Sequence, residues 1–411
     1  MTDHVATRRL KGRSYAETRS AVLDLIRSGD GISRVDLSRR SGLTEATISK
    51  IVKELLAEGV VITVGLAEST GGKRATLLAL NTSVLYALGV TLDVSTIVLV
   101  LCGLNGAAIR RLSLPGLGSD EPADVIERTA NAINALLDDQ GIGREAIVGI
   151  GLASGGRRGG PGGWSIEANL ADRWDRVDVG EAVRAKTGLP VVVENDANCA
   201  ALGTFWSGGA SSPRTFLTIY MAHGIGAGIV IGGSVYRGTG GNAGEIGHIV
   251  VQPDGPLCWC GAHGCLETVA APRGIVRRVL ADEDLRAALD LAPETDGGQV
   301  YRRVLQAYTE GDPEIARIIE TSARWLAQTV LGLANTLDLD WIQLAGPGFA
   351  GTAEVYLEAV RRILGEASLA RGLHPVAVAL GGLEPEVAAL GAASVVLHGN
   401  LTPHHDLVAD Y

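Results

Sequence analysis

The chain has 411 residues, of which 46% are hydrophobic and 20% charged, and its formal net charge is −10. This length predicts two or three globular domains and excludes a single small module. The charge is unevenly distributed, because residues 1–80 hold 13 Lys and Arg against 9 Asp and Glu, whereas residues 81–411 hold 23 against 37. A basic N-terminal part and an acidic remainder indicate that the two parts bind different partners.

The N-terminus gives no sign of export, because residues 1–19 lack the apolar core of a signal peptide. The uncharged stretch at residues 216–233 is long enough to raise the question of a membrane span. It contains His223 and a run of glycines between β-branched halves, which favours two strands joined by a glycine turn. We therefore expect a cytoplasmic protein without a membrane partner.

The N-terminal part has the pattern of three helices. Apolar residues recur at helical spacing over residues 15–28, and a capping box of Ser33 and Asp36 opens a short second helix. A glycine turn at residues 41–43 separates it from a third helix over residues 44–58, whose outer face is small, polar and basic. Two short helices around such a turn are typical of a helix-turn-helix motif.

Residues 60–81 alternate like two strands with a basic tip, which is typical of the wing of a winged helix-turn-helix domain. Lys and Arg neutralise phosphates, and Thr and Ser hydroxyls reach base edges in the major groove. We therefore expect operator DNA as a partner and predict these DNA-binding residues: Thr44, Thr47, Ser49, Lys50, Lys53, Lys73 and Arg74. The competing interpretation, a helical cap with a solvated charged face, explains neither the wing nor the local positive charge.

A different pattern begins after Asn81, where amphipathic segments alternate with apolar strands. This alternation predicts an α/β fold with a mainly parallel or mixed sheet. A strand, a glycine turn and a strand occur again after Thr215, and a late strand follows at residues 341–345. We therefore expect a winged helix-turn-helix domain and two α/β lobes with a cleft between them, at residues 1–80, 81–197 and 198–411.

Two stretches have competing interpretations. The sequence ENDAN at residues 194–198 follows a strand and begins a helix, where ligand-facing residues of α/β proteins usually lie. A carboxylate there can act as general base toward a hydroxyl, but simple N-capping by Asn195 or Asp196 explains the same residues. The glycine-rich stretch at residues 223–228 is compatible with phosphate binding or with a tight hairpin.

The most specific pattern is GEIGH at residues 244–248 followed by CWCGAHGCLE at residues 258–267. Three cysteines and one histidine at these separations can close a tetrahedral zinc site, with the ligands His248, Cys258, Cys260 and Cys265. A cluster of free thiols would be an odd use of reactive groups in a loop. His263 is a competing ligand, but its position inside the loop favours a solvated side chain. The sequence therefore predicts zinc as a cofactor.

These motifs together resemble the ROK family, which joins bacterial sugar-responsive repressors with sugar kinases, and the match covers nearly the whole chain. The N-terminal winged helix-turn-helix is typical of the repressor branch. The resemblance implies a body of two actin-like, ribonuclease H-like lobes of the sugar-kinase type, with a C-terminal helix that returns to the first lobe. It also implies a set of sugar-binding residues: Asn195, Asp196, Glu245, His248 and Glu267.

The implied residues suit this chemistry, because carboxylates and an amide are good partners for vicinal hydroxyls. His248 can ligate zinc by one ring nitrogen and face the sugar with the other, so that zinc would order the sugar site.

The chain departs from the kinase pattern on the nucleotide side. Thr91 stands where the first phosphate motif of the family has an aspartate, and Asp93 and Val94 stand where it has glycines. A carboxylate and a branched side chain in a phosphate loop repel and obstruct ATP. Further departures affect the second phosphate loop, the adenosine turn and the loop near the sugar, at residues 222–223, 346–348 and 154–163.

The sequence therefore predicts a sugar-responsive transcription factor, a homodimer or homotetramer that represses carbohydrate metabolism genes and is not an enzyme. Two other interpretations compete with it. An ATP-dependent sugar kinase with a DNA-binding head, in which Asp196 would be the base, conflicts with the altered phosphate motif. A regulator that has lost sugar binding and responds only to a protein partner conflicts with the retained polar set: Asn195, Asp196, Glu245 and Glu267.

Overall fold

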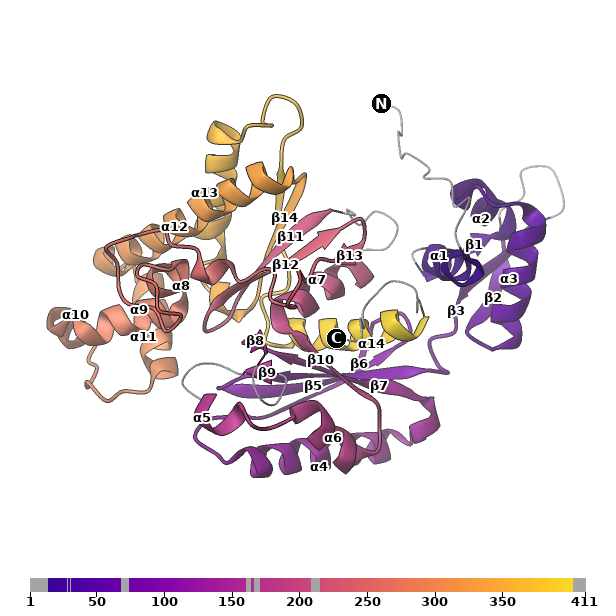
Figure 1. Ribbon diagram of the computed structural model, residues 1–411, viewed down its shortest axis with the longest axis horizontal. Helices are drawn as coiled ribbons and strands as arrows, with labels where there is room; N and C mark the ends of the chain where they lie inside the picture. The colour runs from indigo at the N-terminus through magenta and orange to yellow at the C-terminus, as the bar shows by residue number, and fades with distance from the viewer. Residues whose placement is uncertain are drawn as a thin grey trace.

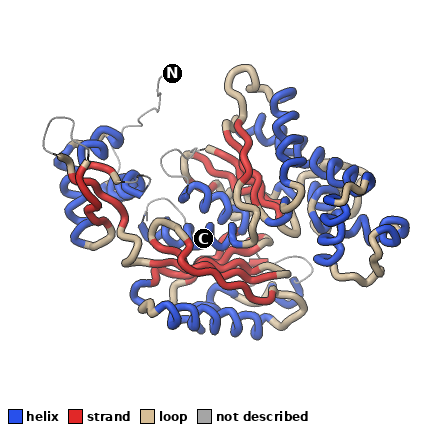
Figure 2. The backbone as a smooth tube through the Cα atoms, turned by 180° about the vertical axis from the view of Figure 1, so that it is seen from behind, coloured by secondary structure: helices blue, strands red, loops and turns tan. Residues whose placement is uncertain are grey.

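The computed structural model describes residues 14–27, 29, 31–67, 74–159, 164–165, 171–207 and 215–401. It consists of an N-terminal head and two α/β lobes (Figure 1), whose sheets stand out as separate groups of strands when the molecule is seen from behind (Figure 2). The fold class predicted from the sequence is thereby confirmed. In the described part of the chain, no helix has the length and apolar character that crossing a membrane requires.

The head contains three helices and a three-stranded antiparallel sheet of order β1-β3-β2. Its elements are α1 (Tyr15–Arg27), β1 (Ile32–Ser33), α2 (Arg34–Ser41), α3 (Glu45–Ala57), β2 (Val61–Leu66) and β3 (Thr76–Leu80). The predicted start of α2 is confirmed, because Ser33 is its N-cap: Ser33 Oγ accepts the backbone N–H of Asp36 at 3.1 Å and donates to the carboxylate of Asp36 at 2.6 Å. The two-residue strand β1 is too short to give a sequence signal. Most of the predicted wing tip, Lys73 included, lies outside the described residues.

The first lobe is built on a mixed five-stranded sheet of order β10-β7-β4-β5-β6. Its strands are β4 (Tyr86–Leu92), β5 (Thr96–Gly103), β6 (Ala108–Pro115), β7 (Ile147–Ser154) and β10 (Val191–Asn195). One face packs against α4 (Pro122–Gln140) and α6 (Val179–Thr187). Four short elements lie between these two helices in the sequence: η1 (Arg144–Ala146), β8 (Arg157–Arg158), β9 (Trp164–Ser165) and α5 (Ala171–Trp174).

The opposite face of this sheet is covered by the last helix of the chain, α14 (Glu386–Leu401). Glycines in the strands permit the close approach. A Cβ at Gly89 would lie 1.8 Å from the carbonyl oxygen of Ala389, and one at Gly151 would lie 2.1 Å from that of Ala392. No side chain fits at either position, so the sequence of these strands is adapted to the C-terminal helix.

The second lobe has a five-stranded sheet of order β13-β12-β11-β14-β15. Its strands are β11 (Phe216–Met221), β12 (Ile225–Ile231), β13 (Ser234–Val235), β14 (Trp341–Ala345) and β15 (Ala377–Leu380). The helices that enclose its core are α8 (Leu266–Ala270), α9 (Pro272–Ala281), α10 (Glu283–Ala288), α11 (Gly297–Thr309), α12 (Pro313–Leu337) and α13 (Ala353–Ala367). Two single turns complete it, η3 (Ile246–His248) and η4 (Pro347–Phe349).

Helix α7 (Asp196–Ser207) lies between the two sheets and contacts β7 and β10 on one side and β11 and β12 on the other. This packing explains the glycine-rich stretch at residues 223–228. Only residues 222–224 form the turn of the β11–β12 hairpin, and Gly228 belongs to β12. A Cβ at Gly228 would lie 2.4 Å from the carbonyl oxygen of Ala197 in α7. The hairpin interpretation is therefore right, and this glycine lets α7 approach the strand.

Candidate functional site

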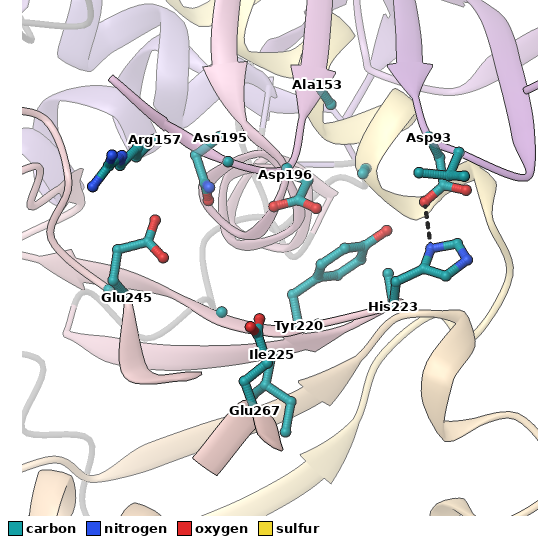
Figure 3. A pocket seen from close by; sticks show the side chains of 18 of the residues that line it. Asp93, Ala153, Arg157, Asn195, Asp196, Tyr220, His223, Ile225, Glu245 and Glu267 are labelled. Carbon is teal, nitrogen blue, oxygen red and sulfur yellow. Dashed lines mark hydrogen bonds and ion pairs between the residues drawn. The ribbon is translucent and has the colours of Figure 1, made fainter. Parts of the chain in front are cut away.

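A cavity of about 420 Å³ lies between the two lobes. Its wall is formed by the ends of β4 and β7, the start of α7, the β11–β12 turn, and the segments around η3 and α8. The five residues predicted to bind a sugar all line it: Asn195, Asp196, Glu245, His248 and Glu267. Figure 3 shows Asp196, Glu245 and Glu267 around one common space. The fold thus brings together residues from three separate motifs.

Asn195 and Asp196 lie where β10 ends and α7 begins. The side-chain oxygen of Asn195 accepts the backbone N–H groups of Ala197 at 2.9 Å and Asn198 at 3.2 Å. One carboxylate oxygen of Asp196 accepts the N–H of Ala197 at 2.8 Å. Asn195 therefore caps α7, and both residues line the cavity. The two interpretations offered by the sequence, N-capping and ligand binding, are compatible with each other.

A buried ion pair lies behind the start of α7. The Glu194 side chain is 2% exposed, and its Oε2 accepts Nε of Arg237 at 2.9 Å and Nη2 at 2.7 Å. Its Oε1 accepts the side-chain amide of Asn198 at 3.1 Å and the backbone N–H of Asn195 at 2.9 Å. Glu194 belongs to the first lobe and Arg237 follows β13 of the second, so this pair joins the lobes.

The second lobe supplies two carboxylates to the cavity. Burial, together with the charges of Asp196 and Glu267, raises the pKa of Glu245 to about 7. Glu267 is buried, its Oε1 accepts the indole N–H of Trp259 at 3.0 Å, and Nη1 of Arg273 lies 3.4 Å from the same oxygen. Carboxylates held in this way accept hydrogen bonds from hydroxyl groups, which is what binding of a polyhydroxylated ligand requires.

A cluster of one histidine and three cysteines adjoins the cavity: His248, Cys258, Cys260 and Cys265. One ligand atom from each lies within 4.8 Å of all the others. Nδ1 of His248 is 3.5 Å from Sγ of Cys258, and Sγ of Cys260 is 3.6 Å from Sγ of Cys265. Tetrahedral zinc with bonds of about 2.3 Å to sulfur and 2.0 Å to nitrogen requires edges of about 3.5 to 3.8 Å. The cluster can therefore hold a metal ion.

His263 lies apart from this cluster. Its side chain is exposed, and its Nδ1 is 3.2 Å from the carbonyl oxygen of Gly255. His248, in contrast, faces both sites, because its Nε2 lies 4.0 Å from a carboxylate oxygen of Glu245 while its Nδ1 faces Cys258. This geometry agrees with the expectation that one ring nitrogen serves the metal and the other the cavity.

Trp259 and Arg157 also line the cavity, and neither was predicted as a site residue, although Arg157 lies in the altered loop at residues 154–163. The Trp259 ring stands edge-on to that of His248, with centroids 4.8 Å apart. Cζ of Arg157, from the first lobe, lies 5.4 Å from the centre of the Trp259 ring. Neither residue could be recognised from the sequence, because the contact between them forms only when the two lobes come together around the cavity.

The part of the cleft where the family resemblance implies a nucleotide in kinases is bridged by residues from both lobes. Oδ2 of Asp93 lies 3.2 Å from Nδ1 of His223, a contact drawn in Figure 3, and Oγ of Ser95 lies 3.0 Å from Nε2 of that ring. Burial favours a higher pKa for Asp93, but the hydrogen bond and charge of His223, together with backbone hydrogen bonds from Ser95 and Thr96, outweigh it and hold the pKa below its ordinary value. Two departures from the kinase pattern thus contact each other.

The predicted DNA-binding residues occupy one helix and the base of the wing. Helix α3 turns Ile48, Ile51, Val52 and Leu55 inward, and the exposed residues of the predicted set are Thr44, Ser49, Lys50, Lys53 and Arg74. Thr44 is the N-cap of α3, and its hydroxyl accepts the backbone N–H of Thr47 at 3.3 Å. Thr47, which was also predicted to bind DNA, is half-buried. Nζ of Lys50 lies 4.7 Å from the centre of the Tyr15 ring in α1.

The fold and the site define a protein with a winged helix-turn-helix head on a two-lobed body of the sugar-kinase type. Residues 16–62 match the model of a winged helix-turn-helix DNA-binding family. Residues 87–398 match the model of the ROK family, and the chain belongs to that family.

The chain is 28% identical to the xylose repressor of Caldicellulosiruptor bescii, over 93% of its own length and 95% of that protein. A solved ROK family transcriptional regulator, described as a homolog of the E. coli MLC protein, shares the fold with a TM-score of 0.72 and 23% identity, over 96% of this chain and 99% of the other. A ROK family glucokinase from Streptomyces griseus, solved with glucose and AMPPNP, matches 75% of this chain and 98% of its own with 26% identity and a TM-score of 0.59.

Proposed function

We propose that this chain is a sugar-responsive transcriptional repressor that binds operator DNA through its head and a neutral monosaccharide in the cleft between its lobes. The observation that carries the proposal is that one chain has both a helix-turn-helix head and a cleft lined by the five polar residues predicted to bind a sugar. On its other side the cleft is bridged by Asp93 and His223. Because a relative that matches this chain over nearly its whole length is named a xylose repressor, D-xylose is the first sugar to test.

The cleft supports a sensor better than a kinase. Phosphoryl transfer depends on positioning the phosphates and neutralising their charge. On the nucleotide side the carboxylate of Asp93 and the ring of His223 face each other, and the Thr91 hydroxyl accepts the backbone N–H of Val98 at 3.0 Å. Asp196 is the base if any transfer occurs, but these groups offer ATP a negative charge and an obstruction. We therefore infer that the chain is not an enzyme.

Zinc is the metal that the donor set favours, because three thiolates and one imidazole form a closed tetrahedral site of the structural type. All four ligands come from the protein, so zinc would hold the loop rather than activate water. The loop carries Glu267 directly after Cys265 and Leu266, and His248 follows Glu245 by three residues. Bound zinc would therefore fix the backbone that positions both carboxylates of the sugar site.

We propose that the repressor acts in the cytoplasm as a homodimer or homotetramer, since two heads related by a twofold axis read an inverted repeat. In each head, the exposed residues of α3 would enter the major groove, with Ser49 facing bases and Lys50 and Lys53 facing phosphates. Arg74, at the base of the wing, would contact the backbone beside the groove.

The proposal is tested with the full chain, D-xylose, D-glucose and N-acetyl-D-glucosamine. We expect one sugar to bind by calorimetry and to change affinity for a duplex that the wild type selects from a random library. The Glu245→Ala variant should keep its metal and lose the sugar response. Failure of every sugar to bind would contradict the sensing role, and ATP-dependent turnover near one per second, abolished by Asp196→Ala, would make the kinase interpretation correct.

A further inference from the structure

Helix α7 extends from the cavity to the head. Its first residue, Asp196, lines the cavity, and its 12 residues reach about 18 Å at 1.5 Å per residue. Near its other end, Trp206 is buried in an apolar cluster that the body shares with the head. This cluster includes Val22 and Ile26 of α1 and Ala393 and Leu397 of α14. The start of the proposed sugar site and the seat of the head thus belong to one helix.

The contact between α7 and the head centres on a buried arginine. The side chain of Arg27, the last residue of α1, is 5% exposed. Its Nη1 donates to the carbonyl oxygen of Trp206, and its Cζ lies 4.3 Å from the centre of the Trp206 ring. Asp24 lies 3.5 Å from Nε, within the same helix. Burial lowers the pKa of Arg27 because it penalises the charged form, and Asp24 opposes that effect.

This arginine therefore caps a helix of another domain. The carbonyl that accepts its hydrogen bond is in the last turn of α7, where unpaired carbonyls and the negative end of the helix dipole favour a cation. A buried charge is costly unless its partners are well placed, so the contact favours one position of the head.

The Trp206 ring is itself held in a closely fitting socket. A Cβ at Gly106, in the β5–β6 turn, would lie 2.6 Å from Cδ1 of the indole. On another side the ring of His398 in α14 stands edge-on to Trp206, with centroids 5.7 Å apart. A displacement of Trp206 therefore requires movement of α7 or of the elements packed on it.

The rest of α7 is firmly packed against its neighbours. At its start, the buried pair of Glu194 and Arg237 ties the helix to both lobes. Along its length it packs against α14 without intervening side chains, because a Cβ at Gly391 would lie 1.9 Å from the carbonyl oxygen of Cys199. Backbone packed this closely passes a displacement on instead of absorbing it by side-chain rearrangement.

We propose that α7 transmits sugar binding to the DNA-binding head, and that the contact between Arg27 and Trp206 is the point at which the two are coupled. This inference rests on the proposed function. A sugar held by Asn195 and Asp196 and by the carboxylates of the second lobe pulls on the start of α7. The same shift changes the position of Trp206 under Arg27. The sugar then binds with different affinities when the contact between Arg27 and Trp206 is made and when it is broken, and such a difference is the thermodynamic requirement for control.

The experiment compares Arg27→Met with Arg19→Met in the full chain. Met retains most of the unbranched apolar stem of the side chain and removes its charge and donors. Arg19 is the matched control, because it lies in the same helix and pairs with Glu58 inside the head. The measured quantity is the ratio of the Kd values for the selected duplex with and without saturating sugar, using the first of D-xylose, D-glucose and N-acetyl-D-glucosamine that binds the wild type.

We expect a wild-type ratio in the usual allosteric range of about 5-fold to 150-fold. The ratio should fall below about 2 in Arg27→Met and stay within about twofold of wild type in Arg19→Met. Sugar affinity of Arg27→Met, measured without DNA by calorimetry, should stay within about threefold of wild type, which a general loss of structure would not allow.

An unchanged ratio in Arg27→Met would overturn the coupling role while leaving the proposed function intact. A wild-type ratio of one would overturn the proposed function and this inference with it. If Arg27→Met fails to fold, Trp206→Phe decides, because Phe keeps the carbonyl acceptor and offers a cation a weaker aromatic face. The ratio of that variant should then fall at least about twofold, and an unchanged value would refute the proposal.

Discussion

Replacing Arg237 by Met tests the buried ion pair that joins the lobes. Met keeps most of the apolar stem but has no donor, so Glu194 retains its negative charge at 2% exposure without a cation. Removing one partner of a buried pair costs about 3 to 5 kcal/mol. We expect the lower end, about 3 kcal/mol, because Oε1 of Glu194 keeps its bonds from Asn198 and from the backbone of Asn195.

The assay is urea unfolding of the full chain, followed by tryptophan fluorescence and by far-UV circular dichroism. The double variant Glu194→Gln with Arg237→Met is the decisive comparison, because a neutral amide needs no counter-charge. It should regain about half of the loss and end within about 1.5 kcal/mol of the wild type. The reasoning is refuted if Arg237→Met loses less than about 1 kcal/mol, or if the double variant is less stable than the single one.

Three further outcomes are expected. Cys260→Ser should lower the zinc content, measured by elemental analysis, well below the wild-type value and reduce thermal stability, and equal zinc in both proteins would exclude the cysteine cluster as the site. Since the pKa of Asp93 is lowered by His223, its ionised form contributes stability at neutral pH that is lost as acid protonates it. The difference in urea midpoint between wild type and Asp93→Asn should therefore be seen at pH 7 and vanish well below the ordinary aspartate value of 3.8, and a difference that grows in acid would contradict this. Gly391→Ala should destabilise the chain by about 1 to 3 kcal/mol through overpacking, whereas Gly332→Ala, where a Cβ meets nothing within 4 Å, should be neutral or stabilising by up to about 1 kcal/mol.

The features that the sequence predicted are those carried by short spacings. The N-cap of α2 needs two residues three apart, and the metal cluster needs four ligands within 18 residues of chain. Such patterns report local geometry directly, since a turn or a helix fixes where the partners lie. Residues 194–198 could likewise be placed at a strand end, although their double role as cap and cavity wall emerged only from the closed cleft.

The pairwise contacts between domains could not be predicted from residue spacing, because their partners are far apart in the chain; the meeting of the sugar-site motifs and the return of the C-terminal helix were expected only from the family resemblance. Asp93 and His223 are separated by 130 residues, and Arg27 and Trp206 by 179. One sequence contains no signal that pairs residues at such distances. Asp93 and His223 could each be recognised as departures from the kinase pattern, but the sequence did not show that they contact each other. Several glycines were ambiguous for the same reason, since what limits a residue such as Gly228 is a helix that follows a different strand.

The return of α14 to the first lobe affects how the protein is made. The strands β4 to β6 leave the ribosome early, but the helix that covers their open face begins at Glu386, roughly 270 residues after β6 ends. At a synthesis rate of about 5 to 20 residues per second, that face waits about 15 to 50 s for its cover. The apolar cluster beneath the head also includes Ala389 and Ala393. A nascent chain can therefore fold the helices of its head long before they can pack on the body, and the contact between head and body forms only after α14 has been synthesised.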